Sequence, residues 1–390
     1  MKFFRHPWFA LASAVAILTL FSRQACSRTW YVDACGGGDM PTIQAAIDTS
    51  SPGDEILVGP GNYSWSTQGG EEAGMITFWD RDMYITVRSE MGPEVTILDA
   101  EFQSRVIYCH GQNWITIDGF TITRGEAPDF GDRVGGGFFT HIPGETVKNC
   151  IFTNNRAEHG GAISCVINDR FFSAENCLFI GNEASRYGGA ISLWNGTSTI
   201  NISGCVFDGN IAGEGGGGLI AYNCPVEVNS CTFYDNTSAD RGAVIHVHTN
   251  GNVQLRENTI CENSTSGPVF SSTSTAYLLI ERTVVAFNRG YLFDLSASTT
   301  GGVGCSNFYG NNSGDALPVE LTDNDRNIFV DPLFCGSPGS HNYFLRSDSP
   351  CFPANRPDGL WCSVIGAWPI DCGDTATEKE SWGSIKNLNK

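Results

Sequence analysis

The sequence has few charged residues and even fewer basic ones. Only 17% of its 390 residues are charged, and 23 Lys and Arg stand against 42 Asp and Glu, which gives a formal net charge of −19. Nucleic-acid binding depends mainly on a basic surface that neutralises phosphates, so we expect no nucleic-acid partner. The sequence does not indicate a disordered chain, because 41% of its residues are hydrophobic and can bury a large core.

Long hydrophobic runs are missing beyond the first residues. A basic segment precedes the apolar stretch from Trp8 to Phe21, and small residues follow that stretch up to Ser27. The stretch is shorter than the ~20 residues of a membrane-spanning helix, and this order of segments is typical of a secretory signal peptide. We therefore expect residues 1–27 to be a signal, no transmembrane segment after its removal, and a protein that is secreted or lies at the cell surface or outer envelope.

The chain also lacks room for crossover helices, because two short motifs repeat through its middle. A Phe-x-x-Asn unit, with Ile or Val at two copies, recurs every 23 to 28 residues, and its Asn residues are Asn155, Asn182, Asn210, Asn236, Asn263, Asn288 and Asn311. Gly-Gly units such as Gly160-Gly161 and Gly188-Gly189 keep the same phase. A period in the twenties filled with short alternating strands predicts an all-β, single-stranded right-handed parallel β-helix, whose coils stack ~4.8 Å apart.

Stacked coils bring equivalent residues into columns. Cys150, Cys177, Cys205 and Cys231 each lie two residues before the repeat Phe and are expected to form a buried cysteine ladder. Metal binding by this ladder is disfavoured because Cys-x-x-Cys spacing is missing. We interpret the Asn column as stacked amides that satisfy turn backbone, which makes glycosylation at the sequons of Asn236 and Asn263 doubtful.

Both ends of such a solenoid need caps. We expect the β-helix domain to span residues 28–372, with an N-terminal cap and first coil over 28–60, a closing region over 323–372 and a polar tail over 373–390. In the N-terminal cap, Asp39 and Pro41 predict the start of a helix over 41–49, whose apolar face is formed by Ile43, Ala46 and Ile47.

The closing region is rich in Pro, Gly and Cys. Cys335, Cys351, Cys362 and Cys372 lie in it, and we expect local disulfides between these residues to staple the C-terminal end.

Two families resemble parts of this sequence. The alternation of Gly-Gly-Ala-Ile with Phe-x-x-Asn over residues 135–311 resembles the repeats of chlamydial polymorphic membrane proteins, which implies a β-helical surface adhesin. Residues 42–63 look like the cap and first coil of the pectate-lyase-like superfamily, which implies the same fold and also includes lyases and glycoside hydrolases. The polygalacturonase motifs Asn-Thr-Asp, Asp-Asp, Gly-His-Gly and Arg-Ile-Lys are absent from the sequence.

A row of charged residues precedes the aligned Gly-Gly units by two positions. It contains Arg133, Glu158, Arg186 and Glu214, whose alternating signs predict an exposed ion-pair ladder. The alternative is catalytic: carboxylates of Asp132, Glu158, Glu214 and Asp240 on neighbouring coils could approach to ~5–9 Å, as glycoside hydrolysis requires. His159 would then be a further candidate acid or base.

Ligand-binding candidates lie beside this row. Arg133 and Arg186 could bind charged groups, and Tyr187 and Trp194 could stack on sugar rings or on a protein partner.

Metal ligands form no convincing set. The pair His246 and His248 lacks a third ligand, and Asp323-Asn324-Asp325 lacks the Gly of a calcium loop. We expect no metal site and no resident cofactor, although the acidic surface leaves Ca²⁺ open.

The sequence predicts a secreted or cell-envelope β-helix protein that binds a macromolecular ligand on its surface, in the manner of an adhesin. The expected partner is an extracellular polysaccharide or a surface protein of a host or neighbouring cell. The alternative function is that of a carbohydrate-active enzyme, either a polysaccharide lyase or a glycoside hydrolase.

Overall fold

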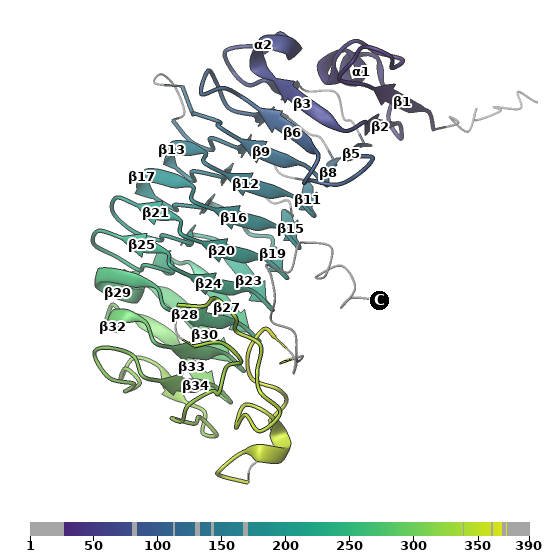
Figure 1. Ribbon diagram of the computed structural model, residues 1–390. Helices are drawn as coiled ribbons and strands as arrows, with labels where there is room; N and C mark the ends of the chain where they lie inside the picture. The colour runs from purple at the N-terminus through teal and green to yellow at the C-terminus, as the bar shows by residue number, and fades with distance from the viewer. Residues whose placement is uncertain are drawn as a thin grey trace, which may run out of the picture.

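The chain folds into one parallel β-helix. The computed structural model describes residues 27–79, 84–111, 114–128, 133–141, 144–166, 171–337, 339–359, 362–368 and 372. Successive coils stack in one direction, and Figure 1 shows their strands as nearly parallel rungs from the N-terminal to the C-terminal end. Among the described residues, no helix is both long enough and apolar enough to span a membrane.

The described strands form four parallel sheets along the solenoid. The twelve-stranded sheet contains β1 (Thr29–Val32), β2 (Glu55–Val58), β5 (Tyr84–Ser89), β8 (Trp114–Asp118), β11 (Thr146–Lys148), β15 (Ser173–Glu175), β19 (Ile200–Ser203), β23 (Pro225–Asn229), β27 (Asn252–Arg256), β30 (Ala276–Glu281), β33 (Thr299–Gly304) and β35 (Thr322–Asp323). The ten-stranded sheet contains β3 (Gly61–Ser64), β6 (Thr96–Asp99), β9 (Thr121–Thr123), β12 (Ile151–Thr153), β16 (Leu178–Ile180), β20 (Val206–Asp208), β24 (Thr232–Tyr234), β28 (Thr259–Cys261), β31 (Val284–Ala286) and β34 (Asn307–Tyr309).

The other two sheets carry the Gly-Gly side of each coil. The nine-stranded sheet contains β4 (Ile76–Phe78), β7 (Ile107–Cys109), β10 (Phe138–Thr140), β14 (Ile163–Val166), β18 (Ile191–Trp194), β22 (Leu219–Tyr222), β26 (Ile245–His248), β29 (Ser264–Thr273) and β32 (Arg289–Asp294). The four-stranded sheet contains β13 (Arg156–His159), β17 (Glu183–Tyr187), β21 (Ile211–Ala212) and β25 (Thr237–Ser238).

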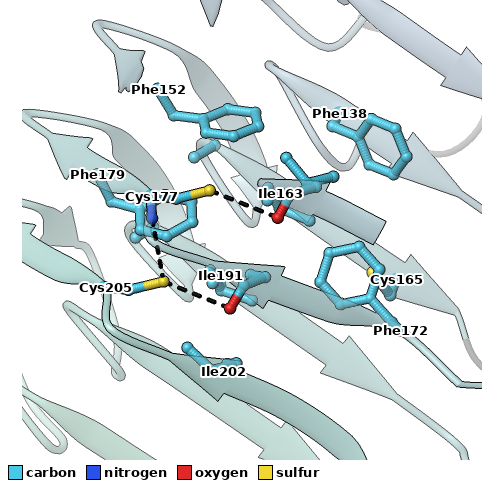
Figure 2. Close-up of a cluster of buried hydrophobic side chains, with 14 of the residues drawn as sticks. Phe138, Phe152, Ile163, Cys165, Phe172, Cys177, Phe179, Ile191, Ile202 and Cys205 are labelled. Carbon is cyan, nitrogen blue, oxygen red and sulfur yellow. Dashed lines mark hydrogen bonds between the residues drawn. The ribbon is translucent and has the colours of Figure 1, made fainter. Parts of the chain in front are cut away.

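The core is a set of columns in which like residues stack. The repeat Phe rings at 152, 179, 207 and 233 follow one another with centroids 5.3, 4.8 and 4.4 Å apart, and all four rings are fully buried. Figure 2 shows the first two of these rings beside the sulfurs of Cys177 and Cys205. Burial of these apolar side chains is the main stabilising contribution of each added coil.

The cysteine ladder is buried, as predicted, and it also accepts hydrogen bonds. The backbone N–H of Cys177 donates to Sγ of Cys205 at 3.4 Å, and that of Cys205 donates to Sγ of Cys231 at 3.4 Å. Asn258 takes the next position, where its Oδ1 accepts from the backbone N–H of Cys231 at 2.8 Å. The column therefore supplies an acceptor for a turn N–H that would otherwise be buried without a partner.

The Asn column forms the predicted ladder. From Asn155 to Asn288, each side-chain Nδ2 donates to Oδ1 of the next Asn at 2.9–3.0 Å, and the ladder ends at Asn311. Asn236 and Asn263 are fully buried in this ladder. Their sequons therefore do not present a side chain to a glycosylating enzyme.

The N-terminal cap contains α1 (Ile43–Thr49), which packs against β1, β2 and β4; a short α2 (Trp65–Gln68) follows. Ile43, Ala46 and Ile47 are buried, which confirms the predicted apolar face. The prediction of Asp39 as the N-cap is wrong: Thr42 caps the helix by accepting from Ala45 N at 3.1 Å. Asp39 instead accepts from Tyr31 N at 3.0 Å.

The segment 331–368, here called the C-terminal strap, leaves the repeat and contains a 3₁₀ helix (Pro353–Asn355). It lies along the outer face of the ten-stranded sheet, where Trp368 Nε1 donates to Thr232 Oγ1 at 2.7 Å and Ala367 N donates to Thr259 Oγ1 at 3.0 Å. In Figure 1 the yellow segment runs back beside β28, β30 and β33.

Two disulfides join the strap to other parts of the chain. One connects Cys335 with Cys372, and the other ties Cys362 to Cys305 at the end of β33. The disulfides at the C-terminal end are thus confirmed, but Cys351 stays a buried free thiol and its place in the bridging set is taken by Cys305. Cys305 follows a repeat strand, so sequence reasoning restricted to the closing region missed it.

Candidate functional site

The predicted charged row lies on neighbouring coils beside the nine-stranded sheet. Its backbone register is set by hydrogen bonds from Glu158 N to Arg133 O at 2.8 Å and from Glu214 N to Arg186 O at 2.7 Å. Glu158 lies between two arginines, 3.4 Å from Arg133 and 3.5 Å from Arg186, and Arg186 Nε donates to Glu214 at 2.6 Å. These four residues form an ion-pair ladder, here called the charge ladder.

Asp240 does not extend this ladder of contacts. Asp240 Oδ2 lies 3.3 Å from Nε of its neighbour Arg241, and its side chain is 68% exposed. Asp132 lies outside the described residues. The described catalytic candidates that come together are therefore Glu158, Glu214 and His159.

Six aromatic and imidazole rings form a closed circuit next to the charge ladder. In order of contact, the members of this ring circuit are Tyr187, His159, Trp194, Tyr222, His248 and His246. In this order, and from His246 back to Tyr187, the centroids of neighbouring rings lie 5.6, 5.1, 5.0, 5.0, 5.6 and 6.0 Å apart.

The ring circuit covers part of the outer face of the nine-stranded sheet. Ile220 lies in register between Ser192 and His246, on the outward side of β22, and it is nevertheless fully buried. An outward-facing side chain is buried in this way only when neighbouring side chains fold over it. Sequence reasoning singled out Tyr187 and Trp194, but it did not show that the two histidines of β26 complete the same circuit.

The circuit contains buried polar atoms that have no hydrogen-bond partner. They are His159 Nδ1, Trp194 Nε1 and His246 Nε2, three of the nine such side-chain atoms among the described residues. His246 is satisfied on its other side, because Nδ1 lies 2.7 Å from Ser271 Oγ. Buried polar groups are nearly always paired, so three unpaired atoms in one circuit distinguish this place from the rest of the solenoid.

A second ring group lies on the same sheet nearer the N-terminus. Tyr108 contacts Trp79 and Phe139, with centroids 5.3 and 5.8 Å apart, and the buried guanidinium of Arg105 lies 5.0 Å from the Phe139 ring. Sequence reasoning missed this group. The sequence contained a signal for it. Tyr108, Phe139, Ser164 and Ser192 occupy equivalent positions on β7, β10, β14 and β18, and only the first two of these positions hold an aromatic residue.

The charge ladder and the ring circuit are in direct contact. His159 Nε2 lies 3.8 Å from Glu158 Oε1, and the Arg186 guanidinium lies 5.3 Å from the centre of the Tyr187 ring. The two groups therefore form one surface, here called the candidate face. All the ligand-binding candidates named from the sequence, Arg133, Arg186, Tyr187 and Trp194, lie on it.

Burial and charge together set the protonation of this surface. Burial lowers the pKa of His159 below its usual value, against the raising effect of Glu158, and burial lowers the pKa of His246 to about 3. The Arg186 hydrogen bond, followed by that of Tyr187, lowers the pKa of Glu214. At neutral pH the two imidazoles are therefore neutral and Glu214 is a carboxylate.

The pKa of Glu214 suits only one of the two roles predicted for the carboxylates. A glycoside hydrolase pairs a general acid of raised pKa with an ionised carboxylate, and the lowered pKa of Glu214 fits the ionised partner. Among the described residues, no group of three or more His, Cys, Asp and Glu is placed to hold a metal ion. The surface offers neutral rings, hydrogen-bonding ring edges and paired charges.

Comparisons with known proteins identify the fold. The family model "Right handed beta helix region" matches residues 105–284, and no curated protein sequence matches the chain. A solved structure, described as the crystal structure of pectate lyase Pel9A, is similar with a TM-score of 0.54 at 12% identity, over 88% of this chain and 97% of that chain. The resemblance to chlamydial polymorphic membrane proteins stays a prediction. The chain therefore has a right-handed parallel β-helix fold, similar to that of the pectate lyase structure.

Proposed function

We propose that this protein binds an extracellular polysaccharide on the candidate face, as an adhesin-like protein that is secreted or held at the cell envelope. The observation that carries the proposal is the ring circuit with its three unpaired polar ring atoms, His159 Nδ1, Trp194 Nε1 and His246 Nε2. Sugar hydroxyl groups both donate and accept hydrogen bonds, so they can pair with each of these atoms after small side-chain rotations.

The spacing of the rings supports a polymer that lies along the solenoid axis. Trp194, Tyr222 and His248 stand on three successive coils, with ring centroids 5.0 Å apart at each step. An extended chain of pyranose sugars advances by a similar length per residue. The rings are tilted against one another, with interplanar angles of 35° and 37°.

A protein partner is less well supported. Protein interfaces on a free surface are marked by large exposed apolar patches, and no member of the ring circuit is among the large hydrophobic residues that are exposed in the described chain. The exposed large hydrophobic residues are scattered: Tyr84 and Phe171 lie at the twelve-stranded sheet, Ile211 on β21 and Tyr291 on β32.

Affinity electrophoresis of the purified chain in gels that contain single polysaccharides tests the proposal. We expect at least one polymer to retard the wild type, and Trp194→Ala to weaken that retardation about tenfold, since a lost aromatic contact costs on the order of 1 kcal/mol. Tyr84→Ala is the matched control, because it removes an exposed ring on the twelve-stranded sheet. Retardation by no polymer, or equal retardation of wild type and Trp194→Ala, overturns the proposal.

A second candidate function is polysaccharide cleavage, favoured by the short distance between His159 and Glu158. A neutral imidazole next to a carboxylate is a suitable general base. The same polymers serve as substrates, with and without Ca²⁺, and unsaturated products and new reducing ends are measured. Turnover that His159→Ala and Glu158→Gln abolish would establish this function, whereas product formation that survives both variants excludes these residues.

A further inference from the structure

We infer that the polysaccharide bound on the candidate face alternates acidic and neutral sugars, with one carboxylate per disaccharide. The inference rests on the proposed function and specifies its ligand. It comes from the order of charges along the charge ladder, where Arg133 and Arg186 occupy the first and third of four consecutive coils and Glu158 and Glu214 the second and fourth.

The distances along the solenoid match such a polymer. Coils follow one another at about 4.8 Å, so the arginines recur about every 10 Å. If each sugar of an extended chain spans one coil, one disaccharide spans two coils. A carboxylate on every second sugar then meets an arginine each time, and the sugar between them meets a glutamate.

The arginines can accept a further carboxylate without unfolding the ladder. Arg186 Nε donates to Glu214, and Arg186 Nη1 lies 3.5 Å from Glu158. The Arg186 side chain is 46% exposed. A guanidinium has five donors in a planar fork that fits carboxylates. Exposed ion pairs contribute only about 0–1 kcal/mol, so a rearrangement of these pairs around a ligand carboxylate costs little.

The intervening glutamates select against other polymers. Glu158 and Glu214 accept hydrogen bonds from sugar hydroxyl groups, but each repels a carboxylate placed on its own coil. A polymer that is acidic at every sugar therefore meets repulsion at every second coil. A neutral polymer meets no repulsion, but it leaves the two arginines of the charge ladder without a ligand charge to bind.

Isothermal titration calorimetry with three polymers tests the inference on the purified full chain. Hyaluronan alternates a uronate with a neutral amino sugar, polygalacturonate is acidic at every sugar, and hydroxyethylcellulose is neutral. We expect hyaluronan to bind at least about tenfold more tightly than either of the others, because a charge-assisted hydrogen bond contributes about 1.5–3 kcal/mol.

Two variants reduce this preference in different ways. Arg186→Gln is expected to weaken hyaluronan binding about tenfold, and the double variant Glu158→Gln with Glu214→Gln is expected to strengthen polygalacturonate binding. The control is Arg346→Gln, which removes an exposed arginine of the C-terminal strap that is paired with Asp348. Thermal unfolding of each variant shows whether it is folded before its binding is measured.

The outcomes separate this inference from the proposed function. Equal or tighter binding of polygalacturonate or hydroxyethylcellulose than of hyaluronan overturns the alternation but leaves polysaccharide binding in place. Unchanged hyaluronan binding by Arg186→Gln also overturns it. If none of the three polymers binds, and no polymer retards the chain in electrophoresis, the proposed function itself fails.

Discussion

Asn210 donates a hydrogen bond from Nδ2 to Oδ1 of Asn236 at 2.9 Å, and each of these residues repeats the same bond with its own neighbour along the ladder. The Asn210 side chain also donates to Phe179 O at 2.8 Å and accepts from Asn182 N at 3.1 Å. One side chain thus links three coils, and it is fully buried.

Asn210→Ala is therefore expected to lower the free energy of unfolding by about 3 kcal/mol, because it leaves several buried donors and acceptors without partners. Urea denaturation measures this loss. Asn201→Ala is the control, since Asn201 lies on β19 of the same coil with an exposed side chain, and it should cost less than about 0.5 kcal/mol. Similar losses for the two variants would show that the ladder is not a main source of stability.

Thiol accessibility provides the second prediction. Cys35 is the exposed free cysteine among the described residues, whereas those of the ladder are buried. Burial also raises the pKa of Cys150 and of Cys224 to about 12, so they remain thiols at pH 8.

Labelling of the folded protein with iodoacetamide at pH 8, followed by peptide mass spectrometry, should modify Cys35 within minutes. Cys150, Cys177, Cys205 and Cys231 should be modified only after denaturation. Rapid modification of any ladder cysteine in the folded state would contradict the buried column.

The repeating part of the fold was predictable because each column reports the same physical requirement many times. The Asn and Cys columns recur at fixed phase, so a chance match at one position does not alter the interpretation. The caps offer no such repetition. Asp39 and Thr42 are both good N-cap residues, and the sequence contains nothing that shows Asp39 to be engaged by the backbone of Tyr31.

The candidate face was predictable only in part. The charge ladder follows from position relative to the Gly-Gly units, and the structure brings Arg133, Glu158, Arg186 and Glu214 together as that register requires. The ring circuit depends instead on contacts between residues at different register positions, such as His159 with Trp194. Such contacts depend on side-chain directions, which periodicity does not specify.

The disulfide between Cys305 and Cys362 should contribute to stability by holding the C-terminal strap on the solenoid. It spans 57 residues, and closure of a loop of this length is worth about 4 kcal/mol in the chain-entropy description. Cys362→Ser is expected to lower the free energy of unfolding by up to this amount in urea denaturation, whereas Cys35→Ser should change it by less than about 0.5 kcal/mol. Equal stability of the two variants would contradict an anchoring role.

The buried imidazole of His246 should make the protein less stable in acid. Burial first, and then the charges of His248 and Arg241, lower the pKa of His246 to about 3 from an ordinary value of 6.5. The unfolded chain therefore binds a proton below pH 6.5 that the folded protein does not bind until about pH 3. The stability present above pH 6.5 is lost as the pH falls through this window, by roughly 5 kcal/mol in total.

His246→Gln removes this titration while keeping a polar group near Ser271. Urea denaturation at pH 7.5, 6.0, 5.0 and 4.0 should show a steep loss of stability for the wild type and a shallower loss for the variant, whatever the stability of each at pH 7.5. The slope of the free energy of unfolding against pH differs between the two proteins by the protons that His246 takes up on unfolding. Parallel curves would mean that this imidazole is already free to ionise in the folded protein.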